Sequence, residues 1–209
     1  TFEMPRGRVS IDAAFIAIEE EPAPQPSGEP FTDVSNRDWF YDAVEYVYET
    51  GMMNGASSNL FEPNGITTRA MIVTILHRLE GEPSVSASHF TDVASNMYYA
   101  DAVGWAQKNG IVNGTSTTAF SPNDPITREQ MAAILYRYAQ FKGYDISAVA
   151  NLSVYRDVSQ ISSYALPAMQ WANAEGLITG DTSVTINPLG GATRAEAATI
   201  LMRFCENIA

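Results

Sequence analysis

The chain has 209 residues, of which 45% are hydrophobic and 17% are charged, a composition typical of globular proteins. Its formal net charge of −12, with only 12 Lys and Arg residues, argues against a nucleic-acid partner, because such binding needs clustered basic residues. No apolar run approaches the roughly 20 residues that a membrane-spanning helix requires.

The first 30 residues differ in pattern from the rest of the chain. Residues 1–18 alternate between apolar and polar positions on both sides of a Pro/Gly turn, which predicts a β-hairpin. Because two strands are not stable alone, we interpret this hairpin as the tail of an upstream β-rich domain. Residues 19–30 are rich in Pro and Glu and predict an extended linker. Thr1 does not open a signal peptide, so we expect the sequence to be part of a longer mature chain.

From Phe31 onward the sequence repeats three times. Residues of the first two copies match at a constant spacing, as Phe31 and Phe90 do. The third copy is the most divergent and needs one extra residue before Trp171. A repeat of this kind predicts equivalent units that share one core, because a single unit cannot bury its apolar face. The three units are expected at residues 31–83, 84–150 and 151–209.

Each copy predicts two helices, and hence a mainly α fold. The first helices have apolar residues at helical spacing, followed by a glycine suited to a left-handed cap, and are expected at residues 41–50, 100–109 and 166–175. Each second helix carries an apolar stripe, and three such stripes can pack around a pseudo-threefold axis.

A threonine stands at the N-cap position of each second helix. These residues are Thr68, Thr127 and Thr193. Gln130 and Glu196 complete a capping box in the second and third copies, whereas Met71 fills that place in the first. We therefore expect two complete boxes.

An arginine follows each capping threonine: Arg69, Arg128 and Arg194. A cation in the first turn opposes the helix dipole, which suggests that something negative binds there. Helix N-termini bind anions through free N–H groups, and a guanidinium adds a fork suited to carboxylate or phosphate. Alternatively, each arginine pairs with an acidic residue of its own domain.

The repeated pattern resembles the S-layer homology domain. It comprises Phe-Thr-Asp-Val at 31–34 and 90–93, Tyr-Arg-Asp-Val at 155–158, an aromatic helix, a loop with Phe-x-Pro in two copies, and Thr-Arg at the second helix. The resemblance implies a three-pronged spindle of tandem helix-loop-helix repeats around a central three-helix bundle. It also implies a module outside the cell that holds a surface protein on the cell wall or in the S-layer of Gram-positive-type bacteria. The implied partner is a peptidoglycan-linked secondary cell wall polysaccharide with a pyruvylated N-acetylhexosamine, bound in grooves between repeats.

Three further sets of repeated residues are candidates for contacts with such a ligand. Aromatic side chains can stack on sugar rings or simply pack in the core, and the candidates are Trp105, Trp171, Tyr46, Trp39, Tyr98 and Tyr164. An aspartate in each copy can accept hydrogen bonds from sugar hydroxyls or cap the following turn, and these residues are Asp33, Asp92 and Asp157. A glycine in each copy can allow close approach of a sugar or adopt positive φ, and these residues are Gly55, Gly114 and Gly180. Because the third copy diverges, we expect binding first in the grooves around Arg69 and Arg128.

Two other functions stay open. A hydrolase of wall glycans needs two carboxylates about 5 to 10 Å apart, and no unrepeated acidic pair stands out. A protein-binding scaffold needs the arginines only for internal ion pairs. His77, His89 and Cys205 show no metal-ligand spacing, and we expect Cys205 to be a buried, inert thiol. We therefore expect a non-enzymatic binding module without metal or cofactor, and a monomer with internal pseudo-threefold symmetry.

Overall fold

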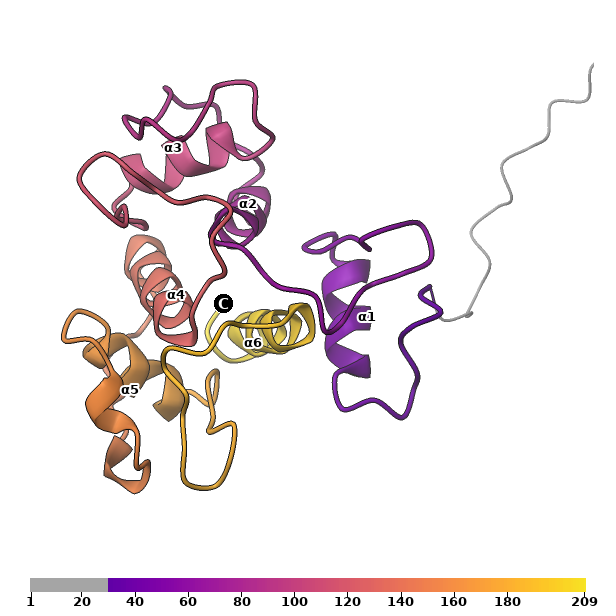
Figure 1. Ribbon diagram of the computed structural model, residues 1–209, viewed down its shortest axis with the longest axis vertical. Coiled ribbons are helices and arrows are strands. Elements are labelled where there is room, and N and C mark those ends of the chain that lie inside the picture. The colour runs from indigo at the N-terminus through magenta and orange to yellow at the C-terminus, as the bar shows by residue number, and fades with distance from the viewer. Residues whose placement is uncertain (1–29) are drawn as a thin grey trace, which may run out of the picture.

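A computed structural model describes residues 30–209, so the predicted hairpin at residues 1–18 and nearly all of the linker lie outside the described residues. Figure 1 shows inner helices around the centre of the molecule and outer helices in peripheral prongs. The inner helices are α2 (Arg69–Leu79), α4 (Arg128–Lys142) and α6 (Arg194–Asn207). The outer helices are α1 (Tyr41–Glu49), α3 (Ala100–Lys108) and α5 (Leu166–Ala174), with short 3-10 helices at Leu152–Val154 and Val158–Gln160. The predicted mainly α spindle around a three-helix bundle is confirmed.

The ends of the outer helices follow the predicted glycines. Gly51, Gly110 and Gly176 each have φ +70°, a conformation that glycine adopts without a Cβ clash. Each helix ends one residue earlier than expected, because the residue before the glycine is the C-cap and closes the last turn through its own N–H.

Threonine caps begin all three inner helices. In each copy the threonine hydroxyl accepts the backbone N–H three residues on. The expectation of only two capping boxes is wrong, since the sulfur of Met71 accepts the backbone N–H of Thr68 at 3.5 Å. A thioether is a weak acceptor, and it completes the same arrangement that Gln130 and Glu196 make with oxygen.

Each prong combines helices from two copies. The outer helix α3 packs on α2, α5 packs on α4, and α1 packs on α6 at the other end of the chain. The outer helix of one copy therefore rests on the inner helix of the preceding copy, and α1 closes the ring on the last helix (Figure 1). The unit that repeats in sequence is thus not the unit that packs.

A closed ring of backbone hydrogen bonds joins the three copies where the inner helices begin. Thr67 N–H donates to Ala192, Ala192 N–H donates to Ile126, and Ile126 N–H donates to Thr67, at 3.1, 3.0 and 2.9 Å. Because each copy is both donor and acceptor, all three are needed to satisfy these buried groups.

Candidate functional site

Three grooves lie between the copies, and each is lined by equivalent positions of all three. We name them after the arginine that opens the inner helix. The Arg69 groove has a volume of about 450 Å³, the Arg128 groove about 330 Å³ and the Arg194 groove about 150 Å³.

The Arg69 groove shows how the copies contribute. The first copy supplies Arg69, and the second supplies residues 113–115 of its loop and one face of α4, including Arg137. The third copy supplies Tyr164. The other grooves repeat this plan with a loop, an arginine near the end of an inner helix, and an aromatic residue. A site built in this way exists only in the assembled ring.

The first arginine of each groove donates to the loop of the next copy. Arg69 Nε donates to the Phe120 carbonyl at 2.9 Å, and its Nη2 donates to the Asn113 carbonyl at 3.2 Å. Its guanidinium also lies over the Phe120 ring, with Cζ 4.7 Å from the centroid. The side chain is 5% exposed, so it stabilises the contact between copies whether or not a ligand is present.

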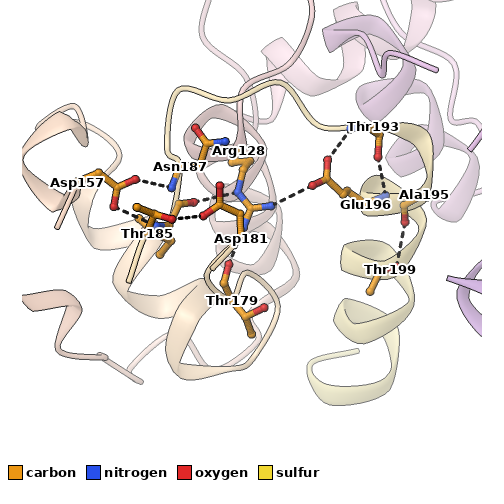
Figure 2. A network of polar contacts seen from close by, with 11 residues as sticks. Arg128, Asp157, Thr179, Asp181, Thr185, Asn187, Thr193, Ala195, Glu196 and Thr199 are labelled. Atoms are coloured by element: carbon orange, nitrogen blue, oxygen red, sulfur yellow. Dashed lines mark hydrogen bonds and ion pairs between the residues drawn. The ribbon is translucent and has the colours of Figure 1, made fainter. Parts of the chain in front are cut away.

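Arg128 and Arg194 repeat this pattern. Arg128 donates to the carbonyl of Thr179 at 2.6 Å (Figure 2) and to the carbonyl of Ile186 at 3.0 Å. Arg194 donates to the carbonyls of Phe61 and Asn54, both at 2.7 Å, so the third copy completes the ring back to the first.

The backbone N–H groups at the starts of the inner helices are occupied. Arg69 N–H donates to the Asp124 carbonyl and Ala70 N–H to the Pro122 carbonyl, and α4 and α6 repeat these bonds with the next copy. The expectation of free helix N–H groups for an anion is therefore wrong. The arginine in the first turn is tolerated because carbonyl oxygens of the neighbouring loop surround its charge.

A second arginine in each groove was missed by the sequence analysis. Arg78, Arg137 and Arg203 line the three grooves. Each lies nine residues after the first arginine of its copy, a regularity that could have identified it. Among the described residues the Arg137 guanidinium makes no hydrogen bond or ion pair, whereas Arg78 pairs with Glu82 and Arg203 donates to the Gly176 carbonyl.

Both arginines of the Arg69 groove are desolvated. Burial lowers the pKa of Arg69, and the nearby Tyr164 and Asp124 oppose this shift. Burial likewise lowers the pKa of Arg137, with Tyr164 again opposing. A lowered pKa means that the charged form has lost hydration, which an incoming anion can replace.

An aromatic residue borders each groove, and these are Tyr164, Trp39 and Tyr98. They are 52%, 68% and 65% exposed, so each presents a face to solvent. The Tyr164 hydroxyl donates to buried Glu129 at 3.2 Å, and burial, together with this carboxylate, raises the pKa of Tyr164 to about 12. The interaction fixes the ring beside Arg69 and Arg137.

Three other aromatic candidates do not line these grooves. Trp105 and Trp171 are 3% and 0% exposed, and their rings contact the core residues Tyr138 and Phe204 respectively. Tyr46 on α1 is half-buried and faces Cys205 on α6. The positions of Trp105 and Trp171 do not support a role in sugar stacking, because an enclosed ring offers no face to a ligand, and Tyr46 lies outside the lining of the three grooves. We leave them out of the proposed binding set.

The acidic candidates hold the loops of their own copies. Each carboxylate accepts two consecutive backbone N–H groups at 2.7 to 3.0 Å, and the residues are Asp33, Asp92 and Asp157. In each loop, the first of the two residues that donate these N–H groups also carries the carbonyl to which an arginine donates, so acid and arginine both hold this point of the loop. The structural alternative is favoured for these acids.

The glycine candidates serve the same loops. A Cβ on Gly114 would overlap the carbonyl oxygens of Ser116 and Ala119, and one on Gly55 would lie 2.5 Å from the Phe31 ring. Neither glycine has positive φ, so that alternative is wrong. The loop's own close packing requires glycine at these positions.

The acidic residues lead to a prediction about acid stability. Burial raises the pKa of Asp157, but the N–H groups of Ile186 and Asn187 outweigh it, and the net pKa lies below the ordinary 3.8. A lowered folded-state pKa contributes stability above the unfolded pKa, and this is lost as pH falls through the folded value. We expect Asp157→Asn to lower Tm by about 2 to 4 °C at pH 7 and by much less near pH 2. Thermal melts from pH 2 to 7 measure this.

The exposed Asp101→Asn, in the first turn of α3, is the matched control. Equal Tm changes for the two variants across the pH range would contradict the role given to Asp157.

The sequence matches the model of the S-layer homology domain at residues 30–70, 89–132 and 154–198. It is 33% identical over 181 residues to an amylopullulanase of Thermoanaerobacterium thermosulfurigenes, covering 84% of this chain and 9% of that protein. It is 31% identical over 180 residues to an endoglucanase of Bacillus sp. (strain KSM-635), covering 86% and 19%. It is 30% identical over 173 residues to the surface-layer 125 kDa protein of Lysinibacillus sphaericus, covering 80% and 14%. The chain thus spans less than a fifth of the length of each of these three relatives.

Within residues 30–209 no helix is long and apolar enough to cross a membrane. The same residues contain no group of three or more His, Cys, Asp or Glu side chains arranged to hold a metal ion.

Proposed function

The chain belongs to the S-layer homology domain family, whose members associate with the cell surface, and we propose that it anchors a surface protein to the cell wall by binding an acidic, pyruvylated secondary cell wall polysaccharide between its repeats. The observation that carries the proposal is the Arg69 groove. It joins two desolvated guanidinium groups and an exposed, fixed aromatic ring in a space of about 450 Å³.

The chemistry of a pyruvylated sugar suits this groove. The ketal carries a carboxylate, and a guanidinium binds a carboxylate through charge-assisted hydrogen bonds. Arg69 Nε and Nη2 are used by backbone carbonyls, so the groove-facing charge comes from the rest of that guanidinium and from Arg137. Tyr164 can stack against the C–H face of the sugar ring. The volume falls within the roughly 300 to 1,000 Å³ typical of small-ligand sites.

We propose binding without turnover. The repeated acids Asp33, Asp92 and Asp157 accept backbone N–H groups, which occupies the carboxylate oxygens that a hydrolase would use on substrate. The relatives named for glycan cleavage match this chain over less than a fifth of their length. The scaffold alternative accounts for the first arginines, which bond internally, but it gives no reason for Arg137, whose guanidinium has no partner within residues 30–209.

We also propose that the module acts outside the cell as a monomer. The outer helix α1 finds its partner in α6 of the same chain, so the ring closes without a second copy.

Binding to purified cell-wall sacculi tests the proposed function. We expect the protein to sediment with sacculi and to remain in solution once the polysaccharide has been removed chemically. Arg137→Gln is expected to weaken retention about tenfold or more, because it removes a desolvated charge without removing any internal bond. Exposed Arg156→Gln, outside the grooves, is the matched control and should bind normally.

Retention that survives removal of the polymer, or that is unchanged in Arg137→Gln, would contradict the proposal. Calorimetric titration with pyruvylated and unpyruvylated N-acetylmannosamine isolates the carboxylate, which we expect to supply most of the binding. Release of reducing sugar from sacculi would favour a hydrolase instead.

A further inference from the structure

We propose that the grooves select ligands by charge, so that the Arg69 groove takes the acidic saccharide and the Arg128 groove takes an uncharged saccharide. This inference rests on the proposed function and concerns which kind of saccharide each groove binds. It starts from one helix position that differs in each copy.

The position is the third residue of each inner helix, which completes the capping box. It is Met71 in α2, Gln130 in α4 and Glu196 in α6, and each side chain lines one groove. All three satisfy the backbone N–H of the capping threonine, so the fold accepts any of them. Their charge is therefore free to set the character of the groove.

In the Arg128 groove this residue compensates the arginine. Glu196 Oε1 lies 3.8 Å from Arg128 Nη1, while its Oε2 accepts the Thr193 N–H at 2.8 Å (Figure 2). The bond to the backbone holds the carboxylate in place, so it remains beside the arginine instead of turning to solvent. A ligand carboxylate arriving at Arg128 would meet this fixed like charge, which weakens binding.

A second acidic residue adds to the charge difference between the Arg128 groove and the Arg69 groove. Asp181 lines the Arg128 groove at the loop position that Thr115 occupies in the Arg69 groove. The Arg128 groove thus combines two arginines with two carboxylates, whereas the lining of the Arg69 groove has two arginines and no carboxylate. With its exposed Trp39 and hydrogen-bonding side chains, the Arg128 groove suits a sugar ring without net charge.

We assign no saccharide to the Arg194 groove. It is lined by two arginines, but its volume of about 150 Å³ is below the roughly 300 Å³ at which small-ligand sites begin. Met52, Met53 and Met71 fill part of it.

Trp39 is an intrinsic fluorescent probe for ligand binding in the Arg128 groove. Of its three tryptophans, Trp105 and Trp171 are buried in the core and Trp39 lies at this groove. Ligand in the Arg128 groove should therefore change tryptophan fluorescence, whereas ligand in the Arg69 groove, bordered by Tyr164, should be detected by calorimetry with little fluorescence change.

The test is the reciprocal exchange Glu196→Gln and Gln130→Glu, because both residues complete the capping box in this fold. In the unmodified protein, N-acetylmannosamine should change Trp39 fluorescence at lower concentration than its pyruvylated form. We expect Glu196→Gln to reverse this order and to strengthen the fluorescence response to pyruvylated sugar about five- to tenfold. Gln130→Glu should weaken calorimetric binding of that sugar by a similar factor. Equal Tm values of the three proteins check that the caps are intact.

A fluorescence response to pyruvylated sugar that is equal in the unmodified protein and Glu196→Gln overturns the inference. So does a complete absence of fluorescence response to either sugar while calorimetric binding persists, which leaves the proposed function standing. Loss of all binding by both methods, in every protein, overturns the proposed function as well.

Discussion

Replacing Arg69 by alanine is expected to lower the free energy of unfolding by about 3 kcal/mol, because one buried and one partly buried backbone carbonyl lose charge-assisted donors. Nε and Nη2 of this side chain bond to Phe120 and Asn113 of the next copy, and the guanidinium covers the Phe120 ring. The substitution therefore removes a connection between two copies, not only a surface charge. Urea unfolding followed by circular dichroism measures the change.

Two other substitutions make this prediction specific. Arg69→Lys keeps a charge but lacks the planar fork, so we expect it to recover less than half of the loss. Arg137→Ala removes a neighbouring arginine whose guanidinium makes no bond to the described part of the chain, and it should change stability by about 0.5 kcal/mol or less. Equal losses for Arg69→Ala and Arg137→Ala would show that the bonds to the neighbouring loop contribute little.

The structural role of Arg69 affects how binding experiments are interpreted. A variant that loosens the contact between copies also deforms the groove, since the loop of residues 113–115 forms its wall. Loss of binding in Arg69→Ala would then report both effects together. Arg137 separates them, because its charge faces the same groove without holding the fold.

The local elements of this fold could be predicted because single residue types determine them. Thr68 and its equivalents act as N-caps, and Gly51 and its equivalents adopt the positive φ that ends the outer helices. Such features depend on neighbours within one helical turn. Helix positions and the shared core of the inner helices therefore follow from periodicity alone.

Contacts between copies could not be predicted in this way. The repeat suggested that the two helices of one copy form a unit, but α1 packs on α6, which begins with Arg194 far along the chain. The spacing of apolar residues along a helix does not indicate which copy its apolar face will pack against. The same limit applies to the site, where Trp105 and Trp39 are similar by residue type, and only packing places one in the core and the other at a groove.

Because α6 packs against helices of other copies, one residue of this last helix should contribute to the stability of the whole ring. Phe204 on α6 is 1% exposed, and its ring lies 5.7 Å from that of Tyr138 on α4 and 6.4 Å from that of Trp171 on α5. We expect Phe204→Ala to lower the free energy of unfolding by about 3 to 5 kcal/mol, the range for a large aromatic removed from a core. Phe141→Ala, at a ring that is 42% exposed, is the matched control and should lose much less.

Because α1 rests on α6, this substitution should also loosen a helix from the opposite end of the chain. Hydrogen exchange of the α1 amides is expected to speed up in Phe204→Ala as strongly as that of α6, although α1 is not the site of change. Independent prongs would leave the exchange of α1 unaltered. The closed hydrogen-bond ring at Thr67, Ile126 and Ala192 predicts coupled opening, since no copy can leave without exposing buried groups of the other two.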